Sequence, residues 1–491
     1  MTTSRLADED TSKFGYTPQF RRTVRSFGSF AIAFSTASAL TGVVTTYGFL
    51  LNLSGPRGIW MWIGSVIGRL AVALIVAQLV ARMPLTGFIY QWSSKLANPV
   101  VGWCMGWLYF ATIPIIVVAT DIGLASQAFM PLFGLEQNPV SVTLVVLTVL
   151  TLQAAIAIYS TRLVNAVNST AVVAELLALA VLTVALFVAA LVTGGFTPAN
   201  LFSTGVVSED GYWSLAGPFM MAALLGAYTI AGFEGAAELS EETQHPSRVA
   251  PRAIMRAVVI SGVTGFVFLF ALTVAMKDIT AASEAGSPVA LILSEYFGPI
   301  MEKLVLALVT VAMFSCALCL MLSASRTCFA MARDRRFPGH RLLGRVPARI
   351  GTPVWATALV WAIGVAIMLT LGQDSNALNN VLAGGTIISV FLYLCTVAVY
   401  LVIRRRLPQA AQGGFDLRRW DLPIAIFAVL WCAFELVVLT VPEMFHAGVV
   451  LSLVFFVTGA LILGWYLIFF RSRFTATEAA PHDTEAQAQA S

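Results

Sequence analysis

Charged residues are scarce in this chain. Asp, Glu, Lys and Arg together make up 11% of its 491 residues, while hydrophobic residues make up 58%. An average soluble domain carries about 25% charged residues, so this composition excludes a single soluble core and predicts a membrane protein with many spanning segments. The formal net charge is only +4, and the arginines form no basic stripe interleaved with stacking aromatic residues. The expected partner is therefore a lipid bilayer and not nucleic acid.

Cysteine and histidine are also scarce, with six and four residues respectively. The cysteines all fall within or beside apolar segments, which predicts buried, inert thiols and no disulfide framework. The histidines are scattered through loops and the C-terminal tail, and no GxxxxGK motif followed by Ser or Thr is present. We therefore expect no enzyme activity, no metal and no cofactor. The N-terminal residues lack the apolar core of a signal peptide, so the first spanning segment is expected to direct insertion.

Long apolar runs are what the chain has in abundance. A spanning helix needs about 20 mostly apolar residues, and twelve runs meet that requirement. They cover residues 27–51, 60–83, 101–129, 139–159, 169–193, 215–239, 254–276, 300–325, 353–372, 379–403, 422–440 and 448–470.

The basic residues between these runs are unevenly distributed. The connections on one side of the membrane hold almost all of them, and the alternate connections hold only Arg57, Lys277 and Lys303. Cytoplasmic loops carry an excess of Lys and Arg, and both chain ends belong to the basic set. We therefore predict that both termini are cytoplasmic and that the chain is a multi-pass protein of a plasma or inner membrane.

Two of the runs are broken in their middles, and they are the first and the sixth. The first is interrupted at Ser38–Gly42, and the sixth is interrupted around Ala231-Gly232 before it reaches Glu234 and Glu238. Irregular backbone survives at membrane depth only where it lines a cavity or binds something. Matched breaks in two halves of a chain indicate the substrate site of a transporter. The alternative for the first run is a face of small residues that allows close helix packing.

Three further stretches, in this order and spacing, are similar to motifs of the amino acid–polyamine–organocation transporters. The likeness is closest to the branch of amino acid, GABA and choline permeases, and it covers about residues 27 to 470. Three positions depart from the usual pattern, because Phe88 replaces a glycine, Glu234 stands where the motif often has aspartate, and Glu238 stands where many members carry histidine. The stretches are Pro84–Trp92; Gly232–Glu234 with Glu241–Thr243 and Pro251–Ile254; and Ser325-Arg326 with Ala332–Asp334 and Thr352-Pro353.

The resemblance implies an all-α LeuT-type fold of two inverted five-helix repeats with twelve transmembrane helices, in which helices 1 and 6 are discontinuous. It also implies alternating access around the two breaks. The expected segments are a cytoplasmic tail (1–26), a first repeat (27–193), a second repeat (214–404), two additional helices (420–470) and a disordered cytoplasmic tail (471–491).

The two breaks offer complementary chemistry for a zwitterion. Half-helix N-termini suit a carboxylate, and freed carbonyls with half-helix C-termini suit an ammonium group. Phe233 follows the sixth-run break directly and is predicted either as a gate over the substrate or as an ordinary lipid-facing or core residue. The predicted substrate-binding residues are Ser38, Thr41, Gly42, Tyr228, Ala231, Gly232 and Phe233.

Arg69 and Asp121 are predicted to form an ion pair inside the membrane. Their depths from the outer ends of their spans, ~14 Å and ~12 Å, are nearly equal. Glu435 has no evident partner and is predicted to be structural. A charge in hydrocarbon costs at least ~2.5–3.5 kcal/mol, so each such group needs a partner, a cavity or a proton.

Glu175, Glu234 and Glu238 are the candidates for proton coupling or for binding a cationic substrate. Burial favours the neutral form of a carboxyl group, and the i, i+4 spacing of Glu234 and Glu238 predicts one shared helix face. Glu241 and Glu242 are predicted to cap a cytoplasmic loop, with Arg252 as a partner.

We therefore expect a secondary active transporter of an amino acid or a small amine (GABA, choline or a polyamine), coupled to a proton or working by exchange. The alternative is sodium coupling, for which Ser315 and Ser323 of the eighth run could offer hydroxyl ligands. A membrane sensor on the same fold is a second alternative, but it would need a soluble output domain that the sequence does not predict.

Overall fold

The computed structural model describes residues 20, 22–347, 349–371, 377–408 and 414–475. Most of the predicted N-terminal tail and of the predicted disordered C-terminal tail, including His482, lies outside these residues. The described secondary structure is helical, apart from one isolated parallel bridge between Val24 and Thr243.

Ten of the described helical segments are long and apolar enough to span a membrane. The sixth and ninth predicted spans are present as shorter apolar helices, so each of the twelve predicted runs has a helical counterpart. The α-helices are α2 (Ser26–Thr36), α3 (Ala39–Leu53), α4 (Met61–Arg82), α5 (Phe88–Leu96), α6 (Pro99–Gly123), α7 (Met130–Phe133), α8 (Pro139–Tyr159), α9 (Thr161–Val192), α10 (Pro218–Met221), α11 (Ala223–Thr229), α12 (Gly235–Glu238), α13 (Pro246–Ala275), α14 (Ile279–Glu284), α15 (Pro288–Arg333), α16 (His340–Leu343), α17 (Val354–Leu371), α18 (Ala377–Ile403), α19 (Asp421–Thr440), α20 (His446–Phe469) and α21 (Ser472–Thr475).

Several helices begin before the apolar runs that predicted them. The helix expected over 169–193 begins at Thr161, where the Ser160 side chain accepts hydrogen bonds from the first-turn N–H groups of Arg162 and Leu163. An apolar run marks only the part of a helix that lies in hydrocarbon, whereas the helix itself continues to its cap. The long helix α15 is two helices joined at Gly298, whose φ of 73° is not helical.

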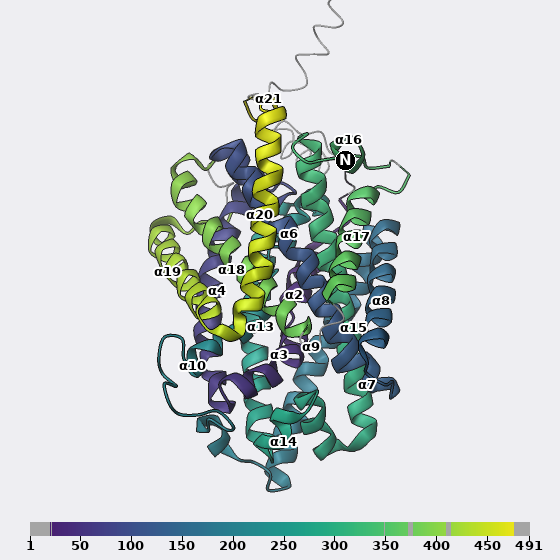
Figure 1. The fold of residues 1–491 in the computed structure, drawn as a ribbon, viewed down its shortest axis with the longest axis vertical. Helices are drawn as coiled ribbons and strands as arrows, with labels where there is room; N and C mark the ends of the chain where they lie inside the picture. The colour runs from purple at the N-terminus through teal and green to yellow at the C-terminus, as the bar shows by residue number, and fades with distance from the viewer. Residues whose placement is uncertain (1–19, 21, 348, 372–376, 409–413, 476–491) are drawn as a thin grey trace, which may run out of the picture.

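The two halves of the first span lie at the centre of the bundle (Figure 1). In the first span, 94% of the most apolar window is buried, against 17% in the last span, so the bundle surrounds the first span and leaves α20 at the periphery. Around this centre, α2 packs on α9 and α13, and α3 packs on α11 and α15. In Figure 1, α16 and α21 mark one end of the bundle, here called the basic end, and α14 marks the other.

Candidate functional site

The first span is interrupted at Ala37 and Ser38, between α2 and α3. Ser38 has extended backbone (φ −63°, ψ 116°), and its hydroxyl accepts a hydrogen bond from Thr41 N–H at 3.0 Å. Serine is a favoured N-cap because its oxygen satisfies a first-turn N–H that has no partner within the helix. The break therefore lies at the start of the predicted stretch, and Leu40 to Gly42 form the first turn of α3.

Glu175 of α9 reaches this break. Its Oε1 accepts hydrogen bonds from the Ser38 hydroxyl at 2.6 Å and from Leu40 N–H at 3.3 Å. The N-terminus of a helix carries partial positive charge, which stabilises a nearby carboxylate. The N-terminus of α3 was predicted to be available to a substrate carboxylate, but in this structure two of its first-turn N–H groups are bound by the chain's own side chains.

The sixth span breaks around Ala231-Gly232, as predicted, between α11 and α12. Gly232 has a φ of 79°, a left-handed conformation that glycine adopts without strain. Its carbonyl oxygen accepts a hydrogen bond from the Thr36 hydroxyl at 2.7 Å, and its N–H donates to the Tyr393 hydroxyl at 3.0 Å. Because Thr36 is the last residue of α2, the two breaks are directly bonded to each other.

A second close approach joins the two broken spans. A Cβ atom on Gly42 would collide with the Thr229 side chain, so only glycine allows α3 and α11 to meet at this distance. The two interpretations of the first run, a face of small residues for close helix packing and a substrate site, are therefore compatible, since close packing brings the two breaks together.

A cavity of about 30 Å³ lies between the two breaks. That volume holds about two water molecules and is below the roughly 300–1,000 Å³ of small-molecule sites, so in this conformation the space between the breaks is nearly closed. The structure brings six of the seven predicted substrate-binding residues to its wall, and their binding role stays a prediction. The six are Ser38, Thr41, Gly42, Tyr228, Ala231 and Gly232.

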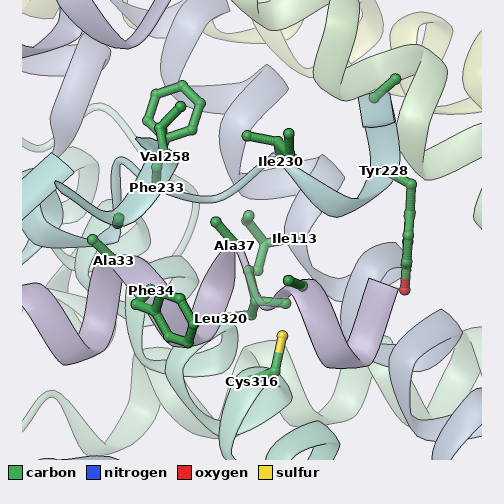
Figure 2. Packing of buried hydrophobic residues seen from close by; sticks show 14 of the residues in the cluster. Ala33, Phe34, Ala37, Ile113, Tyr228, Ile230, Phe233, Val258, Cys316 and Leu320 are labelled. Atoms are coloured by element: carbon green, nitrogen blue, oxygen red, sulfur yellow. The ribbon is translucent and has the colours of Figure 1, made fainter. Parts of the chain in front are cut away.

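Phe233 does not line this cavity. Its ring stacks on Tyr393 with the two planes 7° apart and the centroids separated by 5.3 Å. Figure 2 shows Phe233 beside Val258 at one end of the break and Tyr228 at the other, with Ile230 between them. The gate role predicted for Phe233 therefore has no support in this conformation, and its ring is part of the packed core.

The three candidate carboxylates do not form one cluster. Glu234 precedes α12 and lines the cavity, and its Oε2 accepts a hydrogen bond from the Tyr393 hydroxyl at 2.7 Å. Glu238 lies outside the cavity wall, and its Oε2 accepts a hydrogen bond from Gly87 N–H at 3.2 Å. Glu234 is the N-cap of α12, and its carbonyl oxygen accepts a hydrogen bond from Glu238 N–H at 3.1 Å, so the predicted i, i+4 helical relation is present although the two carboxylates bond to different partners.

Arg69 does not pair with Asp121. The Arg69 Nη2 lies 3.1 Å from Glu435 Oε2, and both side chains are 0% exposed. Asp121 Oδ1 instead accepts a hydrogen bond from Gln153 Nε2 at 2.8 Å. The prediction matched depths along two helices, but depth does not determine the face on which a side chain lies. The predicted pair is therefore wrong, and Glu435 has the partner that the sequence did not reveal.

Ion pairs close the basic end next to Glu238. Glu242 pairs with Arg326 at 2.9 Å, and Glu241 pairs with Arg333 at 3.1 Å. The predicted partner, Arg252, is exposed. Arg252 lies on the first turns of α13, whereas the two observed arginines lie on α15, which crosses the bundle beside α12. The loop-cap prediction thus had the wrong arginine.

The predicted sodium ligands are not arranged around a cation. Ser315 donates a hydrogen bond to Asn168 Oδ1 at 2.8 Å. Ser323 is eight residues further along α15, about 12 Å away at 1.5 Å per residue. Within those residues there is also no group of three His, Cys, Asp or Glu side chains that could hold a metal ion.

The contribution of α6 to the cavity was not predicted from the sequence. Tyr109, Thr112, Ile116 and Thr120 line it from one face of this helix. Their spacing of three or four residues, with hydroxyls inside an otherwise apolar run, was the available signal. Further cavity residues that were not predicted are Thr36, Ile113, Cys316, Leu320, Ser389 and Leu392.

Comparison with known proteins gives relatives over nearly the whole chain. The amino-acid permease BAT1 of Arabidopsis thaliana is 26% identical over 88% of this chain and 87% of the relative. Amino-acid permease 2 of Neurospora crassa is 26% identical over 94% of this chain and 87% of the relative. An uncharacterized amino-acid permease of Schizosaccharomyces pombe is also 26% identical, over 89% of this chain and 82% of the relative.

Solved structures and a family model agree with these relatives. A crystal structure of the Eremococcus coleocola manganese transporter, in complex with an aromatic bis-isothiourea compound, matches with a TM-score of 0.55. The match covers 92% of this chain and 99% of that chain at 12% identity, which shows a common LeuT-type fold. The family model described as amino acid permease matches residues 26–468. This multi-pass membrane protein therefore belongs to the amino acid permease family.

Proposed function

We propose that this protein is a secondary active transporter that moves an amino acid or a small amine, such as GABA, choline or a polyamine, by alternating access. The observation that carries the proposal is the cavity at the junction of the two breaks, which is lined by several hydroxyl groups and by Glu234. Its relatives in Arabidopsis and Neurospora are named amino-acid permeases. The ion pairs at the basic end support a conformation that is closed on that side.

The sixth-span break is the better supported half of the substrate site. We expect an ammonium group to bind beside the Glu234 carboxylate, which lines the cavity. A substrate carboxylate would bind at the first turn of α3, where it must replace Glu175 as the partner of Leu40 N–H. Because Glu175 already occupies that position, an amine without a carboxylate could also bind, and such amines remain in the proposed substrate class.

The proposed coupling is to a proton, or the protein works as an exchanger. Glu175, Glu234 and Glu238 are at most 3% exposed and are not paired with an arginine in the described salt bridges. Buried carboxyl groups without a cationic partner bind and release protons readily as their surroundings change. Sodium coupling is the alternative, and the arrangement of Ser315 and Ser323 gives it no support.

We also propose that the basic end faces the cytoplasm of a cell with this protein in its plasma or inner membrane. The arginine-rich turn Arg404–Arg406 and the arginines around α16 lie at that end. An excess of basic residues is retained on the cytoplasmic side during insertion. Both chain ends would then lie in the cytoplasm.

Uptake into proteoliposomes tests this function. A panel of labelled amino acids and amines is offered under an inward proton gradient, under a sodium gradient and without a gradient. We expect one chemical class to accumulate when the outside is acidic, with no effect of replacing sodium by potassium. A requirement for sodium would establish the alternative coupling, and no movement of any compound, even against a counter-substrate, would contradict the transporter proposal.

A further inference from the structure

Three buried side chains lie behind the sixth-span break and outside the cavity wall: Arg69 of α4, Tyr393 of α18 and Glu435 of α19. All three are 0% exposed. Ionisable groups at membrane depth are costly to bury, so those that occur there usually serve a function. None of the three was among the predicted substrate or coupling residues.

Tyr393 holds three consecutive residues of the break. Its hydroxyl accepts a hydrogen bond from Gly232 N–H at 3.0 Å and donates one to Glu234 Oε2 at 2.7 Å. Its ring stacks on Phe233, which lies between those two residues. A displacement of Tyr393 must therefore move the break and the cavity-lining carboxylate together.

Arg69 connects Tyr393 to the other side of the break. Its guanidinium lies 5.0 Å from the centroid of the Tyr393 ring, and its Nη2 donates to the Ala227 carbonyl oxygen at 3.2 Å. Ala227 belongs to the last turn of α11, where carbonyl groups carry partial negative charge that favours a cation. The same Nη2 lies 3.1 Å from Glu435 Oε2. Both ends of the break are thus held by one connected group of side chains.

The charges of this group are unbalanced. It contains two carboxyl groups, Glu234 and Glu435, but only one guanidinium, that of Arg69. Its net charge is −1 when both carboxyl groups are ionised and zero when one of them holds a proton. Net charge is unfavourable in a buried site, so the buried state favours the form with one bound proton.

The other groups facing Glu234 do not supply a second cation. Glu238 lies four residues further along the chain, and Tyr109 of α6 lines the same cavity and interacts electrostatically with both glutamates. Arg326 of α15 is directed to Glu242 and the Thr161 hydroxyl at the basic end.

We propose that Arg69, Tyr393 and Glu435 are positioning residues that set the pH at which Glu234 takes up the transported proton and that couple protonation of Glu234 to the conformation of the break. The inference rests on the proposed proton-coupled function. Glu435 acts on the site only through Arg69, although it belongs to a helix outside the two predicted repeats. The group therefore connects α19 to the substrate site.

Two variants shift the pH profile of uptake in opposite directions. Tyr393→Phe keeps the ring but removes the donor to ionised Glu234, so the proton is held to higher pH and the midpoint of uptake rises. Glu435→Gln leaves the Arg69 charge without its partner, which favours ionised Glu234 and lowers the midpoint. Each shift is expected to be about one pH unit, the size of one hydrogen bond to a charged group.

The matched control is Tyr400→Phe on the same helix. The Tyr400 hydroxyl lies 3.4 Å from Asp421 Oδ2 and does not contact the break. Its midpoint is expected to equal that of the wild type. Each profile is divided by the variant's own maximal rate, so a loss of folded protein alone does not move the midpoint.

The outcomes separate this inference from the proposed function. If the wild type shows no proton-driven uptake, the proposed function fails. If the wild type shows it but both Tyr393→Phe and Glu435→Gln keep the wild-type midpoint, the function stands and the inference is overturned. Should Glu435→Gln fail to fold, Tyr393→Phe alone decides between an upward shift and none.

Discussion

Replacing Arg69 with glutamine is expected to lower the free energy of unfolding by about 3–5 kcal/mol, the usual effect of removing one partner of a buried ion pair. Arg69 and Glu435 are both 0% exposed and lie 3.1 Å apart. Without the guanidinium, Glu435 is left as a buried carboxylate with no cation, and it must stay unfavourably charged or bind a proton. Thermal unfolding in detergent, followed by intrinsic fluorescence, measures the effect.

Two comparisons make this stability prediction specific. The double variant Arg69→Gln/Glu435→Gln removes both charges and should recover most of the loss, because neither charge is left unpaired. Arg82→Gln breaks an arginine–carboxylate pair at the C-terminal end of α4, where Arg82 and Asp416 are 15% and 35% exposed. Exposed pairs contribute about 0–1 kcal/mol. An Arg69→Gln protein as stable as Arg82→Gln would contradict the assignment of the buried pair.

Glu234→Gln is expected to abolish proton-driven accumulation. Of the three candidate carboxylates, all within the described residues, Glu234 lines the cavity and Glu175 and Glu238 do not. Glutamine keeps an oxygen that can accept the Tyr393 hydroxyl, but it cannot bind and release a proton. One coupled proton supports about tenfold accumulation per unit of pH difference, so the variant should equilibrate the substrate and not concentrate it. Accumulation ratios in proteoliposomes at two pH differences measure this.

Glu175→Gln and Glu238→Gln are the comparisons for this prediction. Glu175 bonds to Ser38 and Leu40 at the first break, and Glu238 bonds to Gly87 at the basic end. Both variants should still accumulate substrate, although their rates are expected to fall. Accumulation by Glu234→Gln at the wild-type ratio would assign coupling elsewhere, and if all three variants accumulate normally none of these carboxylates carries the proton.

The spans and the two breaks, which depend on residues close together in the sequence, could be predicted. Apolar length predicted the spans, and glycine or serine inside an apolar run predicted both breaks, because those residues disrupt a helix or cap a new one. Even so, the first break lies at Ala37 and Ser38, slightly before the centre of the predicted stretch. A hydroxyl cap starts the next helix at once, so Thr41 and Gly42 are helical.

Pairing between distant helices was not predictable in the same way. Arg69 and Asp121 share a depth, but α4 presents Arg69 to α19 while α6 presents Asp121 to α8. Tyr393 gave no signal, since an aromatic residue in an apolar run is ordinarily part of the core. Its role depends on two hydrogen bonds to a break more than 150 residues away in sequence.

The central claim is that the substrate binds between the two breaks, and Cys316 allows a direct measurement because its thiol lines that cavity. Cys316 is 4% exposed in this conformation, so a small methanethiosulfonate reaches it only when alternating access opens the cavity; a variant with Cys316 as its only cysteine is therefore labelled during transport, with and without a transported compound. A variant with only Cys104, which is not part of the cavity wall, is the control. At about ten times its Kd, the compound should slow labelling of Cys316 roughly tenfold and leave Cys104 unaffected. An unchanged Cys316 rate with a compound that the protein transports would contradict the account.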